Sequence, residues 1–291
     1  METILCAVDL SPATRAVVAW AHLFARQLNA RLHLFHAVHT PSDSLHPTTE
    51  FERGGALQKR RESSRQQIEQ IMAGAEIPWQ AEIAFGEPAE MIQQFCHNQN
   101  IDLVIAGTKG VRGLKRLLYG TVVERMARMV NCPLLALQPT VDESIKLEHI
   151  GICCDMTKGS HRLIDYGLRL AQAFEAEVYL LHAMETPLAP GLVEPTDAPY
   201  GQVQQTLQVR LQGELLAMVP EKKREAIGVS AHLVPGQAQE SIPELAGTLN
   251  IDMVLVGVRR HSPIGKWVLG STTEALLRDA RCQVLTVPVR S

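Results

Sequence analysis

The chain has 291 residues, of which 46% are hydrophobic and 20% charged, a composition typical of a globular protein long enough for two ordinary domains. Its formal net charge of −3 gives no general attraction to nucleic acid or to an acidic membrane surface. No stretch reaches the roughly 18 apolar residues of a membrane span. The amino-terminal segment lacks the basic and long apolar regions of a secretory signal, so we expect a cytoplasmic protein whose six cysteines are reduced.

Apolar runs that are typical of strands alternate with amphipathic runs that are typical of helices along the first half of the chain. The expected strands are 4–8, 32–38, 81–85, 102–106 and 134–137, and the expected helices are 13–28, about 56–73, 88–98 and 121–130. Buried parallel strands are continuous apolar runs, and a strand–helix–strand unit makes a right-handed crossover. The pattern predicts an α/β fold: a doubly wound, Rossmann-like sheet of five parallel strands flanked by helices.

The segment GTKGVRGLKRLLYGT, residues 107–121, lies between the fourth expected strand and the helix that follows it. Its glycines have the spacing G-x2-G-x9-G, and Thr121 comes directly after the last of them. Glycine lets a ligand approach the backbone without a Cβ in the way, and the free N–H groups at the start of a helix attract an anion. The segment therefore predicts a phosphate site, with a tight turn and an N-capping threonine as the alternative.

The second half of the chain repeats the first. The run ILCAVDLS at 4–11 returns as IGICCDMT at 150–157, and QNIDLVIAGT at 99–108 returns as LNIDMVLVGV at 249–258. A nearly constant offset over several segments is the signature of an internal repeat. We expect two tandem homologous domains, residues 1–140 and 147–291, each with its own doubly wound sheet.

The glycine loop, the run AVDLS after the first strand and the run HAV at the end of the second together resemble the universal stress protein family, and the duplication resembles its tandem two-domain class. The resemblance implies a cytoplasmic stress protein, usually dimeric, that binds ATP or AMP with or without magnesium. It implies that Asp9 contacts the adenosine, that the backbone at Val38 holds the base, and that the loop glycines and Thr121 hold the phosphates. The nucleotide-binding positions implied in this way are Ala7, Val8, Asp9, Val38, Ala106, Gly107, Lys109, Gly110, Gly120, Thr121 and Val122.

The second copy departs from this pattern in its loop, where Arg260 replaces the second glycine. If that position needs a positive φ, a non-glycine residue there is strained by roughly 1–2 kcal/mol. The side chain would also crowd the phosphate path, although a guanidinium can itself grip a phosphate. We therefore expect impaired or altered nucleotide binding in the second domain. Its candidate site consists of Asp155, Met184, Gly257, Arg260, Gly270 and Ser271.

The sequence favours a regulator or interaction module over an enzyme. Hydrolysis needs a base to orient water and usually a metal, and Asp9 is the one obvious carboxylate at the first crevice. No cysteine–histidine set has zinc spacing, and His36 and His182, which are equivalent in the repeat, are expected to be packed or surface residues. Slow ATP hydrolysis, adenylate chemistry, and an apolar ligand in the second domain under the 185–201 loop are the alternatives.

The expected partner is an adenine nucleotide, with no nucleic acid and no membrane span. The last strand of each copy is expected near a sheet edge, and an edge strand invites pairing, so we expect the two domains to pair there. Association of two chains into a homodimer and the identity of a regulatory protein partner stay open.

Overall fold

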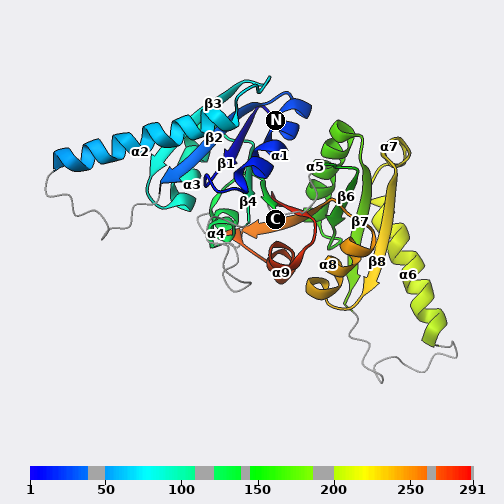
Figure 1. Cartoon of the computed structure of the whole chain (residues 1–291). Coiled ribbons are helices and arrows are strands. Elements are labelled where there is room, and N and C mark those ends of the chain that lie inside the picture. The colour runs from blue at the N-terminus through cyan, green and yellow to red at the C-terminus, as the bar shows by residue number, and fades with distance from the viewer. Residues whose placement is uncertain (39–49, 109–120, 139–144, 186–199, 261–266, 290–291) are drawn as a thin grey trace. The chain divides into compact units, whose positions relative to one another are not determined.

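The computed structural model describes residues 1–38, 50–108, 121–138, 145–185, 200–260 and 267–289 (Figure 1). The described residues divide into two compact units: the first is Met1–Ile145 together with Trp267, and the second is the rest of the chain from Lys146 onward. No helix among the described residues is long and apolar enough to cross a membrane. Within each unit, strands alternate with helices that cover the sheet.

The first unit is a parallel sheet flanked by helices, as the sequence predicts. Its described elements are β1 (Thr3–Ala7), α1 (Thr14–Gln27), β2 (Arg31–Val38), α2 (Glu50–Ile71), β3 (Trp79–Phe85), α3 (Pro88–Gln99), β4 (Leu103–Gly107), α4 (Thr121–Met129) and β5 (Leu134–Leu137). The strand order is β3-β2-β1-β4-β5, and every neighbouring pair is parallel. The chain thus winds outward from β1 to β3 and then returns to the other side of β1, which is the doubly wound topology.

The second unit repeats this topology. Its described elements are β6 (His149–Cys153), α5 (Lys158–Phe174), β7 (Glu177–Met184), α6 (Tyr200–Ala217), α7 (Glu221–Ile227), β8 (Val229–Pro235), α8 (Ala238–Thr248), β9 (Met253–Arg260), β10 (Trp267–Val268), α9 (Ser271–Asp279) and β11 (Gln283–Val289). The order β8-β7-β6-β9-β11 is again all parallel. Helix α7 has no counterpart in the described part of the first unit, and the sequence did not predict it.

The central strands of each sheet are buried on both faces. In β1, Ile4, Leu5 and Cys6 have no exposed surface, and in β4 the same holds for Leu103 and Val104. Burial on both faces explains why these strands are continuous apolar runs rather than alternating ones. The winding direction reverses between β1 and β4 in the first unit and between β6 and β9 in the second. The carboxyl ends of these strand pairs are therefore the places where a ligand crevice is expected.

Asp102 and Asp252, the aspartates of the repeated N-I-D motif, each tie the start of a central strand to the sheet. The Asp102 carboxylate accepts the backbone N–H groups of Glu2 and Thr3, at 2.7 and 3.1 Å. The Asp252 carboxylate accepts the two equivalent N–H groups at the start of β6, both at 2.8 Å. These carboxylates lie at the amino-terminal ends of the strands, opposite the crevices, so the repetition of this motif reflects folding.

We expect Asp102→Ala and Asp252→Ala each to lower the free energy of unfolding by about 1–2 kcal/mol, because two hydrogen bonds to a charged acceptor are lost. Denaturant unfolding of the full chain measures the change. The Asp→Asn variants are the controls: they keep one acceptor oxygen and should lose less. Alanine variants as stable as the unmodified chain would contradict the assigned role.

Candidate functional site

Asp9 follows β1 at the point where the first sheet reverses its winding. Its Oδ1 accepts the backbone N–H of Ser11 at 3.0 Å and the hydroxyl of Thr14 at 3.2 Å. The turn holds Leu10 in the left-handed region, with φ of 57°. Asp9 itself is exposed. The aspartate therefore shapes the turn between β1 and α1, and the turn in return fixes the carboxylate at the carboxyl end of β1.

His36 and His182 support this turn in the same way in both units. The Nδ1 atom of His36 lies 2.8 Å from the carbonyl oxygen of Val8, and the Nδ1 atom of His182 lies 2.8 Å from that of Cys154. A carbonyl oxygen can only accept, so Nδ1 carries the proton in each ring. Each histidine thus links the second strand of its sheet to the residue before the crevice aspartate, and both act as positioning residues.

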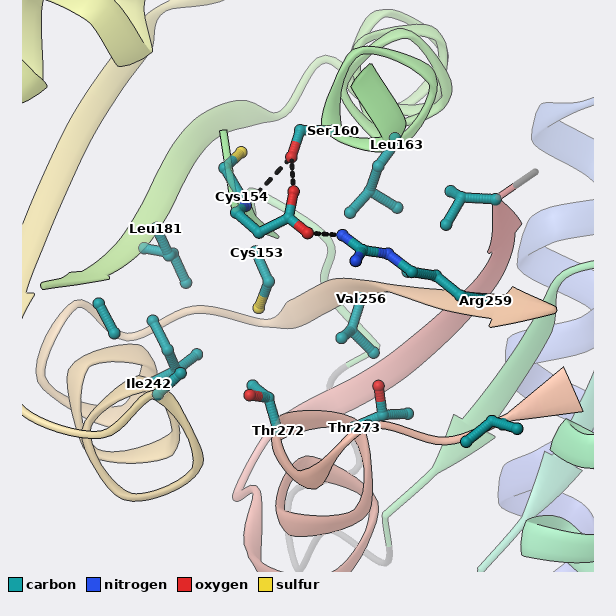
Figure 2. Close-up of a pocket in the computed structure, with 18 residues that line it drawn as sticks. Cys153, Cys154, Ser160, Leu163, Leu181, Ile242, Val256, Arg259, Thr272 and Thr273 are labelled. Carbon is teal, nitrogen blue, oxygen red and sulfur yellow. Dashed lines mark hydrogen bonds and ion pairs between the residues drawn. The ribbon is translucent and has the colours of Figure 1, made fainter. Parts of the chain in front are cut away.

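The second unit contains a pocket of about 330 Å³ at the carboxyl ends of β6 and β9 (Figure 2). Leu163, Leu181, Ile242 and Val256 form much of its wall. The polar lining residues include Asp155, Arg259, Ser160, Thr272 and Thr273. The pocket lies where a doubly wound fold is expected to bind its ligand.

Both oxygens of the Asp155 carboxylate are engaged within the protein. Oδ1 accepts the backbone N–H and the hydroxyl of Thr157, at 3.1 and 2.7 Å, and the hydroxyl of Ser160 at 2.6 Å. Oδ2 forms an ion pair with Nη2 of Arg259 (Figure 2). The same guanidinium nitrogen donates to the Thr157 hydroxyl at 3.2 Å. Within the pocket, the guanidinium of Arg259 therefore neutralises the charge of the Asp155 carboxylate.

Cys153 ends β6, and its sulfur points into the pocket (Figure 2). Burial raises the pKa of its thiol well above the ordinary value, so the thiol is neutral at physiological pH. A neutral thiol packs as a small apolar group. The equivalent position in the first repeat is Ala7, which makes this part of the second crevice more crowded than the first.

A sequence model of the Universal stress protein family matches residues 1–138 and again residues 146–288. The chain belongs to this family. It is 28% identical over 148 residues to universal stress protein A homolog 1 of Coxiella burnetii, a match that covers 48% of this chain and 95% of that protein. A match to a universal stress protein of Methanocaldococcus jannaschii, 39% identical over 57 residues, covers 20% of this chain and 34% of that protein.

A solved universal stress protein from Archaeoglobus fulgidus shares the whole two-domain fold, with a TM-score of 0.71, 17% identity and coverage of 98% of both chains. At this identity the likeness shows the fold alone. Together with the two family matches, it confirms the predicted family, the tandem duplication and the Rossmann-like fold of each domain.

In this universal stress protein, the structure gathers part of the predicted first site. Ala7 and Ala106 are partners in the parallel register of β1 and β4, and Gly107 ends β4 beside them. Val38 ends β2, and its carbonyl oxygen accepts the backbone N–H of Gly86 at 3.1 Å. Val8 and Asp9 follow β1, and Val122 lies half-buried in α4. Lys109, Gly110 and Gly120 lie outside the described residues, and Thr121 is described only as the first residue of α4.

The predicted second site is brought together in part. Asp155, Gly257 and Gly270 line the pocket, whereas Met184 at the end of β7 and the exposed Ser271 at the start of α9 do not. Arg259 was missed by the sequence reasoning, which considered only its neighbour Arg260. A signal was present, because Arg259 aligns in the repeat with Lys109, a predicted contact of the first site.

The condition for backbone strain at Arg260, a need for a positive φ, is not met. Strand β9 continues through Gly257 to Arg260, three residues further than the equivalent end of β4, so Arg260 has extended backbone that any residue adopts. Gly257 is also not in the left-handed region. A Cβ there would lie 3.1 Å from Cγ2 of Val289 on β11, so glycine at this position allows the two strands to pack closely.

Proposed function

We propose that the first domain of this universal stress protein binds ATP or AMP at the carboxyl ends of β1 and β4, and that the chain acts as a nucleotide-dependent regulator in the stress response. The observation that carries the proposal is the position of Asp9: an exposed carboxylate, fixed by its own turn, at the winding reversal of a doubly wound sheet. Ligands of such folds bind at this point.

The ribose and the phosphates of a nucleotide are bound by different groups, and the first domain has candidates for both. An ionised carboxylate only accepts hydrogen bonds, which suits the hydroxyl groups of a ribose. The sequence from 107 to 121 offers four glycines, four basic side chains and the start of α4, which suit the phosphates. The proposal also includes the domain bounds 1–140 and 147–291, a cytoplasmic location, pairing of the two domains and a function in binding rather than catalysis.

Calorimetric titration of the nucleotide-stripped full chain with ATP and with AMP tests the proposal, and one site per chain is expected. Asp9→Asn should weaken binding at least about tenfold, because the amide replaces an acceptor oxygen by a donor while its remaining oxygen keeps the turn to Ser11. The matched control is Asp155→Asn in the second domain, which should leave affinity and stoichiometry unchanged. The absence of saturable heat with both nucleotides, or equal affinities of Asp9→Asn and the unmodified chain, would overturn the proposal.

A further inference from the structure

We propose that Arg259 is a specificity-determining residue that excludes ribose-bearing ligands from the second domain by occupying the carboxylate of Asp155. The inference rests on the proposed function, because it takes the ribose contact of Asp9 in the first domain as its reference. It assigns a role to an arginine that the glycine-loop pattern does not include.

The carboxylate of Asp155 is already engaged through both of its oxygens. A carboxylate offers about four lone-pair sites. Oδ1 already accepts three hydrogen bonds, two from Thr157 and one from Ser160, and Oδ2 is taken by the guanidinium of Arg259. A ribose hydroxyl that took the place of Arg259 on Oδ2 would leave the guanidinium to be satisfied elsewhere, so the ion pair disfavours a sugar at this carboxylate.

Arg259 is held in this position from two sides. Its backbone belongs to the parallel ladder of β9 with β11, opposite Val289. Its Nη2 atom contacts both Asp155 and the hydroxyl of Thr157, which also accepts the backbone N–H of Gly159 at 3.3 Å. The side chain thus bridges the end of β9 and the turn after β6, which is the place where the winding reverses (Figure 2). These two contacts hold the half-exposed guanidinium of Arg259 against the carboxylate at the mouth of the crevice.

The equivalent turns of the two domains differ in what they leave for a ligand. Ser11 takes the place of Thr157 in the first domain. Its hydroxyl is buried and has no hydrogen-bond partner within the described part of the chain, whereas the Thr157 hydroxyl has three. A buried hydroxyl without a partner is costly, so the first turn gains from a polar ligand atom nearby. The second turn satisfies its polar groups internally and gains nothing from one.

Titrations of the full chain with ATP and with adenosine test the inference. Adenosine carries the ribose without phosphate, so it reports on the carboxylate independently of Arg260. The unmodified chain should bind one equivalent of each ligand, at the first domain. Arg259→Ser should bind two, the second with an affinity within about tenfold of the first, and Arg259→Ser combined with Asp155→Asn should return to one. Arg210→Ser removes an exposed arginine of α6 that pairs with Glu214, and it is the control for the loss of charge.

The outcomes separate this inference from the proposed function. If Arg259→Ser still binds one equivalent, and adding Asp9→Asn weakens that binding, the inference is overturned and the proposed function stands. If the unmodified chain binds neither ligand but Arg259→Ser binds one that depends on Asp155, the proposed function is overturned and the inference stands. The inference would also be overturned if the unmodified chain bound two equivalents, and if Asp9→Asn and Asp155→Asn each weakened the binding of one of them. Saturable binding by none of the variants would overturn both.

Discussion

Replacing Gly120 with valine is expected to weaken ATP binding by at least about a hundredfold, equivalent to roughly 2.7 kcal/mol. Gly120 directly precedes the first residue of α4, where the free N–H groups and the helix dipole favour an anion. A branched side chain at this point would stand between those N–H groups and a phosphate. The same substitution at Gly270, the equivalent residue before α9, is expected to leave nucleotide binding unchanged.

Gly270, the equivalent of Gly120, shows that backbone strain does not require a glycine directly before this helix. Its φ and ψ are −73° and 162°, which any residue adopts, and no heavy atom lies within 4 Å of a Cβ placed there. Neither conformation nor packing requires a glycine at the N-cap of α9, so the expected effect of Gly120→Val is attributed to the approach of a ligand and not to strain. In the second domain the glycine persists although Arg259 occupies the crevice carboxylate, so the repeats share this glycine before the helix while Arg259 takes the place of Lys109.

Calorimetry on Gly120→Val and Gly270→Val, side by side, measures the difference, and circular dichroism confirms that both remain folded. Equal affinities of Gly120→Val and the unmodified chain would show that the nucleotide does not approach the start of α4. A loss of binding in Gly270→Val, with Gly120→Val unaffected, would move the site to the second domain.

The strands could be predicted from the sequence because their signal is local. Each central strand is buried on both faces and flanked by helices, so it stands out as a short apolar run whose ends differ from the observed ones by one or two residues, as in β1 and β4. Helices are less well bounded. Helix α2 begins at Glu50, several residues before the predicted start near 56, because its first turns carry no apolar stripe that pattern reasoning could detect.

Helix α7 could not be predicted, because it is short and has no buried residues. Its limits are set by Pro220, which suits the position before a helix, and by Gly228, whose φ of 75° ends it. Such signals also occur in ordinary turns, and the amphipathic pattern that separates a helix from a turn is missing here. The second repeat therefore gained a surface helix without a change in its apolar pattern.

The position of the crevice aspartates was predictable, but what binds them was not. Asp9 and Asp155 follow directly from the repeat and from the rule that ligands bind at strand carboxyl ends. The contact of Asp155 with Arg259 depends on β9 continuing past Gly257, which directs the arginine side chain toward the neighbouring turn. The glycine-loop pattern predicts a loop at residues 259 and 260, and it draws attention to Arg260 alone because Arg260 stands in place of a glycine.

Gly167 in α5 lies against the centre of the second sheet, and Gly167→Ala is expected to lower the free energy of unfolding by about 1–2 kcal/mol. An added Cβ would lie 2.4 Å from Cδ1 of Ile152 and 3.2 Å from Cδ2 of Leu255. Both neighbours are fully buried, so neither can move aside freely. Overpacking of this kind costs about 1–3 kcal/mol, and the gain of roughly 1 kcal/mol in helix propensity from glycine to alanine offsets only part of it.

The first repeat indicates how the chain accommodates an alanine at this position. Ala21 is the equivalent of Gly167, and Cys6 is the equivalent of Ile152, so a larger helix residue occurs with a smaller strand residue. Ile152→Cys alone should destabilise the protein by about 2 kcal/mol or more through the cavity it leaves. Combined with Gly167→Ala it recreates the pair of the first repeat. The loss of unfolding free energy in the double variant should be smaller than the sum of the two single losses by about 1–3 kcal/mol. Denaturant unfolding of the two single variants and the double variant measures this coupling, and strictly additive losses would show that the helix and strand residues at these positions vary independently.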